Sequence, residues 1–91
     1  MEKKIYEFNG IKVGELQTPT FGKLKKLNEL GCKTDDVESI NKFWLSCLSN
    51  FGNAQKLASV VIGSEIDEEL SPAVLKEAFL DFLGECGLLI T

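Results

Sequence analysis

Four glycines divide most of this chain into short segments in which apolar residues recur every three or four positions. Gly31, Gly52, Gly63 and Gly87 each follow such a segment, and glycine is common just beyond the last residue of a helix. The spacing of the apolar residues is typical of amphipathic helices. We therefore expect a mainly α (α+β) fold, with an N-terminal β-hairpin packed on four helices. The expected helices span about residues 19–30, 35–50, 54–62 and 72–86.

Each predicted helix begins near a residue whose side chain is suited to cap a helix N-terminus. The expected caps are Thr18, Asp35 (with Thr34 as an alternative), Asn53 and Ser71. Pro19 and Pro72 follow the first and last of these caps, and proline is favoured at the first position of a helix. A chain of 91 residues is expected to form a single domain, spanning residues 1–91.

The N-terminal residues 4–16 predict the β-hairpin. Asn9-Gly10 is the favoured dipeptide of a type I′ turn, because both central residues of that turn have positive φ. The apolar members of the two strands then share one face, which we expect to pack against the helices, since an isolated hairpin is unstable. On the other face, Gly14 marks a close approach or a weak point. The predicted pairs are Phe8 with Ile11, Glu7 with Lys12, Tyr6 with Val13 and Lys4 with Glu15.

Composition and charge exclude several functional classes. The chain has 10 Lys and Arg against 14 Asp and Glu, a net charge of −4, and it contains no histidine. Sites built on a Ser-His-Asp triad, a Cys-His pair or a histidine zinc ligand are therefore excluded. An acidic chain without a basic stripe is a poor binder of nucleic acid. The sequence contains neither a signal peptide nor an apolar run long enough to span a membrane, so we expect a cytoplasmic protein.

No residue pattern indicates catalysis or a bound cofactor. Cys32, Cys47 and Cys86 are odd in number and lack a C-x-x-C spacing, which indicates reduced thiols. The acidic segment at 65–69 lacks the glycine and the ligand spacing of an EF-hand, so we interpret it as a solvated loop. We therefore predict that the protein is not an enzyme, with no catalytic residue, metal, cofactor or small-molecule substrate.

Two of the predicted helices carry more apolar surface than one core requires. At about 100° per residue, Phe43, Trp44 and Leu45 spread over about 200° of the second helix, and Leu80 widens the apolar stripe of the last helix. Either the second helix is central and covered on two sides, with the hairpin as one cover, or the excess apolar residues bind a partner chain. The predicted partner-binding residues are Phe43, Leu45, Leu80, Leu88, Leu89 and Ile90.

The order of these segments resembles that of small tail assembly chaperones from long-tailed phages and prophages. The resemblance rests on F-N-G-I-K-V followed by T-F-G-K-L-K-K-L-N-E-L-G, and later on Q-K-L-A-S-V-V-I-G, an acidic loop and L-S-P-A-V-L-K-E-A-F-L-D-F-L. The sequence departs from the family pattern at Gly14 and Trp44. The resemblance implies a non-enzymatic protein that coats an aggregation-prone helical tape measure protein. Such proteins are often made in two lengths by a translational frameshift, and the apolar tail at 88–90 lies where that junction would fall.

Two other functions remain open at this point. The chain is also compatible with a small acidic adaptor that docks on a host or phage enzyme, or with a structural tail component that forms rings. The state of the protein in solution distinguishes them. Concentration-dependent self-association favours the chaperone, a clean monomer favours the adaptor, and a discrete ring favours the structural component.

Overall fold

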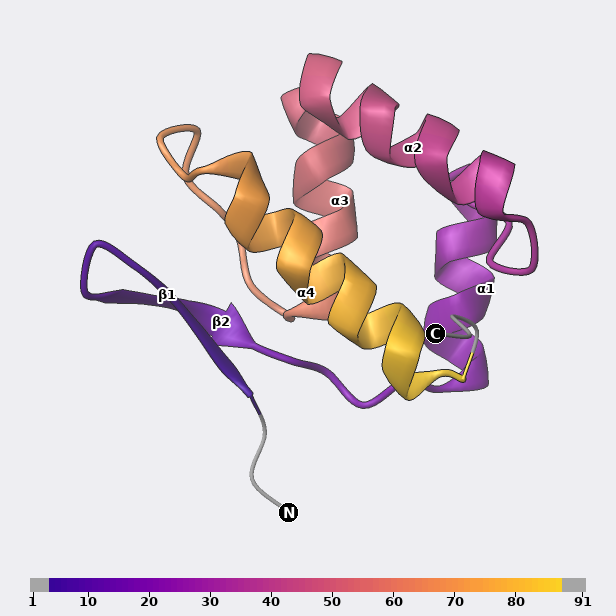
Figure 1. Ribbon diagram of the computed structural model, residues 1–91, viewed down its shortest axis with the longest axis horizontal. Coiled ribbons are helices and arrows are strands. Elements are labelled where there is room, and N and C mark those ends of the chain that lie inside the picture. Colours follow the sequence, from indigo (N-terminus) through magenta and orange to yellow (C-terminus); the bar gives the residue numbers. More distant parts are fainter. Residues whose placement is uncertain (1–3, 88–91) are drawn as a thin grey trace.

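The structure, a computed structural model, describes residues 4–87 and consists of an antiparallel hairpin followed by four helices (Figure 1). This confirms the expected mainly α fold with a small β component. The elements are β1 (Ile5–Phe8), β2 (Ile11–Glu15), α1 (Phe21–Glu29), α2 (Val37–Ser49), α3 (Phe51–Val61) and α4 (Pro72–Glu85).

Helix α3 is the central element of the helical part, because it packs against α1, α2 and α4. Its two small residues Ala54 and Ala58 are buried, which allows the neighbouring helices to approach closely. The hairpin packs through β1 against α4 and lies on the far side of the fold from α2 (Figure 1). The interpretation that α2 is central, with the hairpin as one of its covers, is therefore wrong.

The boundary between α2 and α3 differs from the prediction. Asn50 is extended, with φ −141° and ψ 103°, and its side chain accepts a hydrogen bond from the backbone N–H of Asn53 at 3.3 Å. It therefore caps α3, which begins at Phe51 rather than at residue 54. Gly52 lies inside the first turn of α3 and does not end α2.

Helix α1 begins two residues later than expected. The Thr20 hydroxyl accepts a hydrogen bond from the backbone N–H of Lys23 at 3.2 Å and caps the helix. Pro19 consequently lies outside α1, whose first residue is Phe21. The side chain of Phe21 is 94% exposed, so it does not belong to the apolar stripe that its spacing predicts.

Of the caps predicted for the two remaining helices, the one for α2 is wrong and the one for α4 is confirmed. Asp36 caps α2 by accepting a hydrogen bond from the backbone N–H of Glu38, so the cap lies one residue beyond Asp35. Ser71 caps α4 as predicted, and Pro72 is the first residue of that helix. The end of α4 at Glu85 is within one residue of the prediction.

The hairpin has the predicted turn but not the predicted register throughout. Asn9 and Gly10 both have positive φ, at 54° and 77°, and the pairs nearest the turn are those expected from a two-residue connection. A bulge then shifts the register between Tyr6 and Glu7, so that Tyr6 pairs with Gly14. The shift leaves Val13 as the extra residue of β2. The predicted pairs Tyr6–Val13 and Lys4–Glu15 are therefore wrong, and Ile5 pairs with Glu15.

The bulge brings the base of the hairpin onto the helices and leaves its tip free. Tyr6 is buried and Val13 packs against the core, as expected for the apolar face. Gly14 marks a close approach, since a Cβ on it would lie 3.0 Å from the Cβ of Ile62 at the end of α3. Ile11 is nevertheless 71% exposed, because the tip extends past α4 (Figure 1).

One continuous core joins the hairpin to all four helices. Phe82 and Leu57 are fully buried at its centre, and the ring of Phe43 meets that of Phe79 edge to face with 6.3 Å between centroids. Among residues 4–87, every buried side-chain nitrogen and oxygen has a hydrogen-bond partner.

Candidate protein-binding surface

The predicted partner-binding residues fall into three groups in the structure. Leu45 on α2 and Leu80 on α4 are 62% and 43% exposed, so both are available to a partner. Phe43 is 5% exposed and belongs to the core, so its assignment to a binding surface is corrected. The remaining three residues, Leu88, Leu89 and Ile90, lie outside the described part of the chain.

Helix α2 has two distinct apolar sides. Its buried residues Ile40, Phe43 and Cys47 face the core. At about 100° per residue, four further apolar residues lie within about 100° of one another on the neighbouring side of the helix. They are Val37, Trp44, Leu45 and Leu48, of which Trp44 is half-buried and the others are exposed. This second side carries the apolar surface in excess of what the core uses.

Helix geometry relates the direction of Leu80 on α4 to that of Leu45 on α2. The rings of Trp44 and Phe79 are in contact, with 6.4 Å between their centroids. Leu45 and Leu80 each follow one of these residues by one position, or about 100° of helix. Because α2 and α4 run in opposite directions (Figure 1), this step turns both leucines to the same side of the helix pair. We call the surface formed by Trp44, Leu45, Leu48 and Leu80 the α2–α4 face.

A hollow of about 310 Å³ adjoins this face where α2 ends. Trp44, Leu48 and Phe51 line it on one side, and the loop that precedes α4 lines it on the other, through Ile66 and Leu70. The hollow therefore extends the exposed apolar surface from α2 towards the acidic loop.

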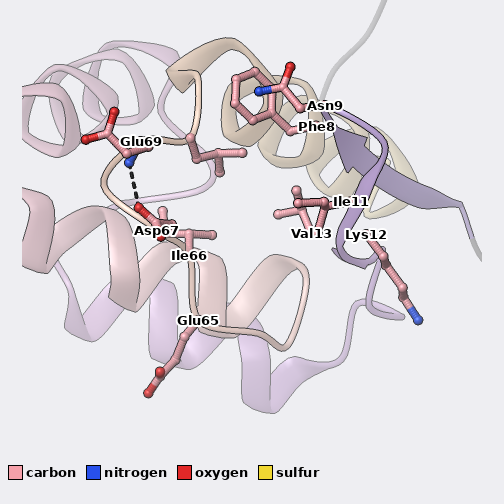
Figure 2. A pocket seen from close by; sticks show the side chains of 10 residues that line it. Phe8, Asn9, Ile11, Lys12, Val13, Glu65, Ile66, Asp67 and Glu69 are labelled. Carbon is pink, nitrogen blue, oxygen red and sulfur yellow. Dashed lines mark hydrogen bonds between the residues drawn. The ribbon is translucent and has the colours of Figure 1, made fainter.

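A second hollow of about 340 Å³ lies on the other side of that loop. Ile66, Asp67 and Leu70 line both hollows, so the loop forms a ridge between them. The far wall of the second hollow is the tip of the hairpin, and Figure 2 shows Ile11, Val13 and Ile66 pointing into the space between.

A polar cluster fixes the hairpin to α4 away from these hollows. The Tyr6 hydroxyl donates a hydrogen bond to the Asp81 carboxylate at 2.7 Å, and Lys4 Nζ lies 2.7 Å from the same carboxylate and 3.0 Å from that of Glu77. Burial alone would raise the pKa of Asp81, but the hydrogen bonds from Lys4 and Tyr6 outweigh it and hold that pKa below its ordinary value. Burial and the bond to Asp81 both raise the pKa of Tyr6.

The thiols are poorly suited to nucleophilic chemistry. Cys32 and Cys47 are buried, and burial raises the pKa of each to about 11, so both are neutral thiols at pH 7. Within residues 4–87, no three acidic or cysteine side chains gather as a metal site would require. None of the helices in the described part of the chain has the length and apolar character needed to cross a membrane.

Val37 and Leu48, which the sequence did not single out as partner-binding residues, lie on the exposed side of α2. The signal that identifies them is their separation of 11 positions, close to three whole turns, which puts them on one line along the helix. That line is displaced by about 60–80° from Ile40 and about 120–140° from Phe43.

Comparisons with known proteins do not assign the chain to a family. No protein-family model matches it, and neither a curated protein nor a solved structure is significantly similar to it.

Proposed function

We propose that this protein is a non-enzymatic chaperone that binds an aggregation-prone helical client through its α2–α4 face. The observation that carries the proposal is the exposure of Leu45 and Leu48 on α2 and of Leu80 on α4, two helices that meet through the rings of Trp44 and Phe79. Contiguous apolar residues that a chain leaves in water are typical of sites at which another protein binds. An amphipathic helix laid against such a face covers its apolar side chains with its own.

The size of the face suits weak, repeated binding. Complete burial of one leucine side chain contributes about 1.5–3 kcal/mol, and these leucines are already partly covered. A single copy would therefore bind with modest affinity, while many copies along one long client would bind it cumulatively. The net charge of −4 keeps the loaded copies soluble and mutually repulsive.

The segment order supports a specific setting for this activity. Because the sequence resembles tail assembly chaperones of long-tailed phages, we propose that the client is the tape measure protein and that the complex forms in the host cytoplasm. The hairpin followed by short helices is compatible with that resemblance.

Co-expression tests the proposal. The tape measure protein of the same phage genome is produced alone, with the wild-type chain, or with Phe21→Asp, which charges a still more exposed apolar residue on α1. We expect both chains to bring the client into the soluble fraction and to co-purify with it. A client that stays insoluble, or that is equally soluble without the chain, contradicts the proposal.

A further inference from the structure

The hollow between the hairpin tip and the loop before α4 is a formed apolar groove. Phe8, Ile11 and Val13 line it from the hairpin, and Ile66 and Leu70 line it from the loop (Figure 2). Ile11 remains largely in water although its neighbours are apolar. The groove therefore presents apolar surface that the chain itself does not cover.

The loop wall of this groove is held in one conformation. The side-chain amide of Gln55 on α3 forms two hydrogen bonds with the backbone of Ile66, donating to its carbonyl at 2.6 Å and accepting from its N–H at 2.8 Å. At the next residue along the loop, the Asp67 carboxylate accepts a hydrogen bond from the backbone N–H of Glu69 at 2.8 Å (Figure 2). A partner thus meets a prearranged wall and does not have to order it.

The groove is bordered by negative charge. Glu65, Asp67 and Glu69 line it, Glu68 lies between them in the chain, and the ion pairs found in residues 4–87 involve none of the four. Lys12 also lines the groove, but it is paired with Glu15 at 2.6 Å and its side chain points away from the groove in Figure 2. Among the described residues, the carboxylates on the loop side of the groove therefore have no ion-pair partner, and one of them, Glu65, also borders a neighbouring hollow with Lys26 and Lys56.

We propose that this groove binds an apolar side chain of an amphipathic client helix whose neighbouring residues are lysine or arginine. The apolar lining takes the anchor residue, and the acidic border attracts its basic neighbours, so the charge of the border selects the client. This inference rests on the proposed function and adds the chemistry of the client to it. An acidic helix or a polyanion would be repelled by the same border.

The test uses two synthetic amphipathic peptides that share the same leucine positions. One carries lysine at every polar position and the other carries glutamate. Dissociation constants are measured with the full chain at about 50 and about 300 mM NaCl, since screening weakens interactions between exposed charges. We expect the lysine peptide to bind at least about tenfold more tightly at low salt, and the difference to shrink at high salt.

Two matched variants separate the effect of the acidic border on peptide binding from the effect of net charge. Glu65→Gln/Glu68→Gln/Glu69→Gln neutralises the border and keeps Asp67, whose carboxylate holds the loop. Glu29→Gln/Asp35→Asn/Glu85→Gln removes the same number of charges from exposed positions elsewhere. We expect the border variant to weaken binding of the lysine peptide by about tenfold and the control to weaken it less than about threefold. Amide shifts at Ile11 and Ile66 locate the peptide.

Each outcome bears on the inference. Equal binding of both peptides, equal effects of the two variants, or shifts confined to the α2–α4 face would overturn it and leave the proposed function standing. Failure of both peptides to bind would overturn the inference, while solubilisation of the tape measure protein tests the proposed function separately.

Discussion

Gly14 is the residue at which the absence of a side chain matters most directly. A Cβ there would lie 3.0 Å from the Cβ of Ile62 and 3.1 Å from the Ile62 carbonyl oxygen, and neither atom can move without shifting α3. We expect Gly14→Ala to lower the free energy of unfolding by about 1–3 kcal/mol, because the added methyl group overpacks this contact. Urea unfolding at neutral pH measures the loss.

Gly84 provides the control for this substitution. It lies in α4, and a Cβ on it would meet no atom within 4 Å. We expect Gly84→Ala to leave the free energy of unfolding unchanged or to raise it by up to about 1 kcal/mol, since alanine is the better helix former. Equal destabilisation by both alanine substitutions would contradict the account of Gly14.

The buried thiols predict how stability changes at alkaline pH. Burial raises the pKa of Cys32 and Cys47 to about 11 from an ordinary value of 9.0, so the folded state favours the neutral thiol. Their contribution is fully present below pH 9 and is lost as the pH rises towards 11. We expect the free energy of unfolding to fall over this interval in the wild type.

The double variant Cys32→Ala/Cys47→Ala tests this cause. We expect its stability to fall less than that of the wild type between about pH 9 and pH 10, because only the smaller effects of Cys86 and Tyr6, whose pKa values burial also raises, remain. Urea unfolding at a series of pH values gives both curves. If the free energy of unfolding begins to fall at the same pH and by the same amount in both proteins, the two thiols are not the cause.

At the scale of elements, the hairpin depends on its link to α4. The Tyr6 hydroxyl bonds to Asp81 across the two elements, and an isolated two-stranded hairpin is unstable. We expect Tyr6→Phe to cost about 1 kcal/mol and to speed amide hydrogen exchange in β1 and β2 more than in the helices. Lys12→Gln, which removes an ion pair within the hairpin, serves as the control.

A change confined to the helices, or equal acceleration by Tyr6→Phe and Lys12→Gln, would contradict this role of Asp81.

The lowered pKa of Asp81 gives a related expectation. Its contribution to stability is present above the ordinary carboxyl pKa of 3.8 and is lost as the pH falls through the lower folded-state pKa. As the pH is lowered, the backbone amides of the hairpin should therefore lose protection against hydrogen exchange at a higher pH than those of α3.

The sequence predicted correctly the turns and helix boundaries that depend on a local interaction. The Asn9-Gly10 turn and the Ser71-Pro72 start of α4 were predicted correctly because each depends on adjacent residues. The start of α3 was missed because Gly52 is tolerated in a first turn once Asn50 caps it. The bulge in β2 was not predicted: Gly14 indicated a close approach, but the hairpin sequence does not identify Ile62 as the residue that is approached.

At the scale of the whole molecule, the sequence predicted an excess of apolar surface but not which residues expose it. Phe43 and Leu45 both lie in the wide apolar sector of α2, and their chemistry does not distinguish them. Their exposure depends on where α3 and α4 cover α2. Leu45 and Leu80 were identified correctly as exposed, whereas Leu48 was missed, for the same reason.

The exposed α2–α4 face also predicts self-association. In the absence of a client, two copies can cover this face only with each other, and the net charge of −4 opposes that contact at low salt. We expect the mean mass in solution to rise with protein concentration, and more steeply at high salt. Light scattering across a concentration series measures it, and a monomer at every concentration would contradict the expectation.

We propose that Leu45 and Leu80 serve client binding and are not needed for folding. The most direct test is the variant Leu45→Asp/Leu80→Asp, with the free energy of unfolding and client solubilisation measured on the same preparation. We predict a free energy within about 1 kcal/mol of the wild type and loss of client binding, while Phe21→Asp retains both. An unfolded double variant, or a folded one that still binds the client, would contradict the claim.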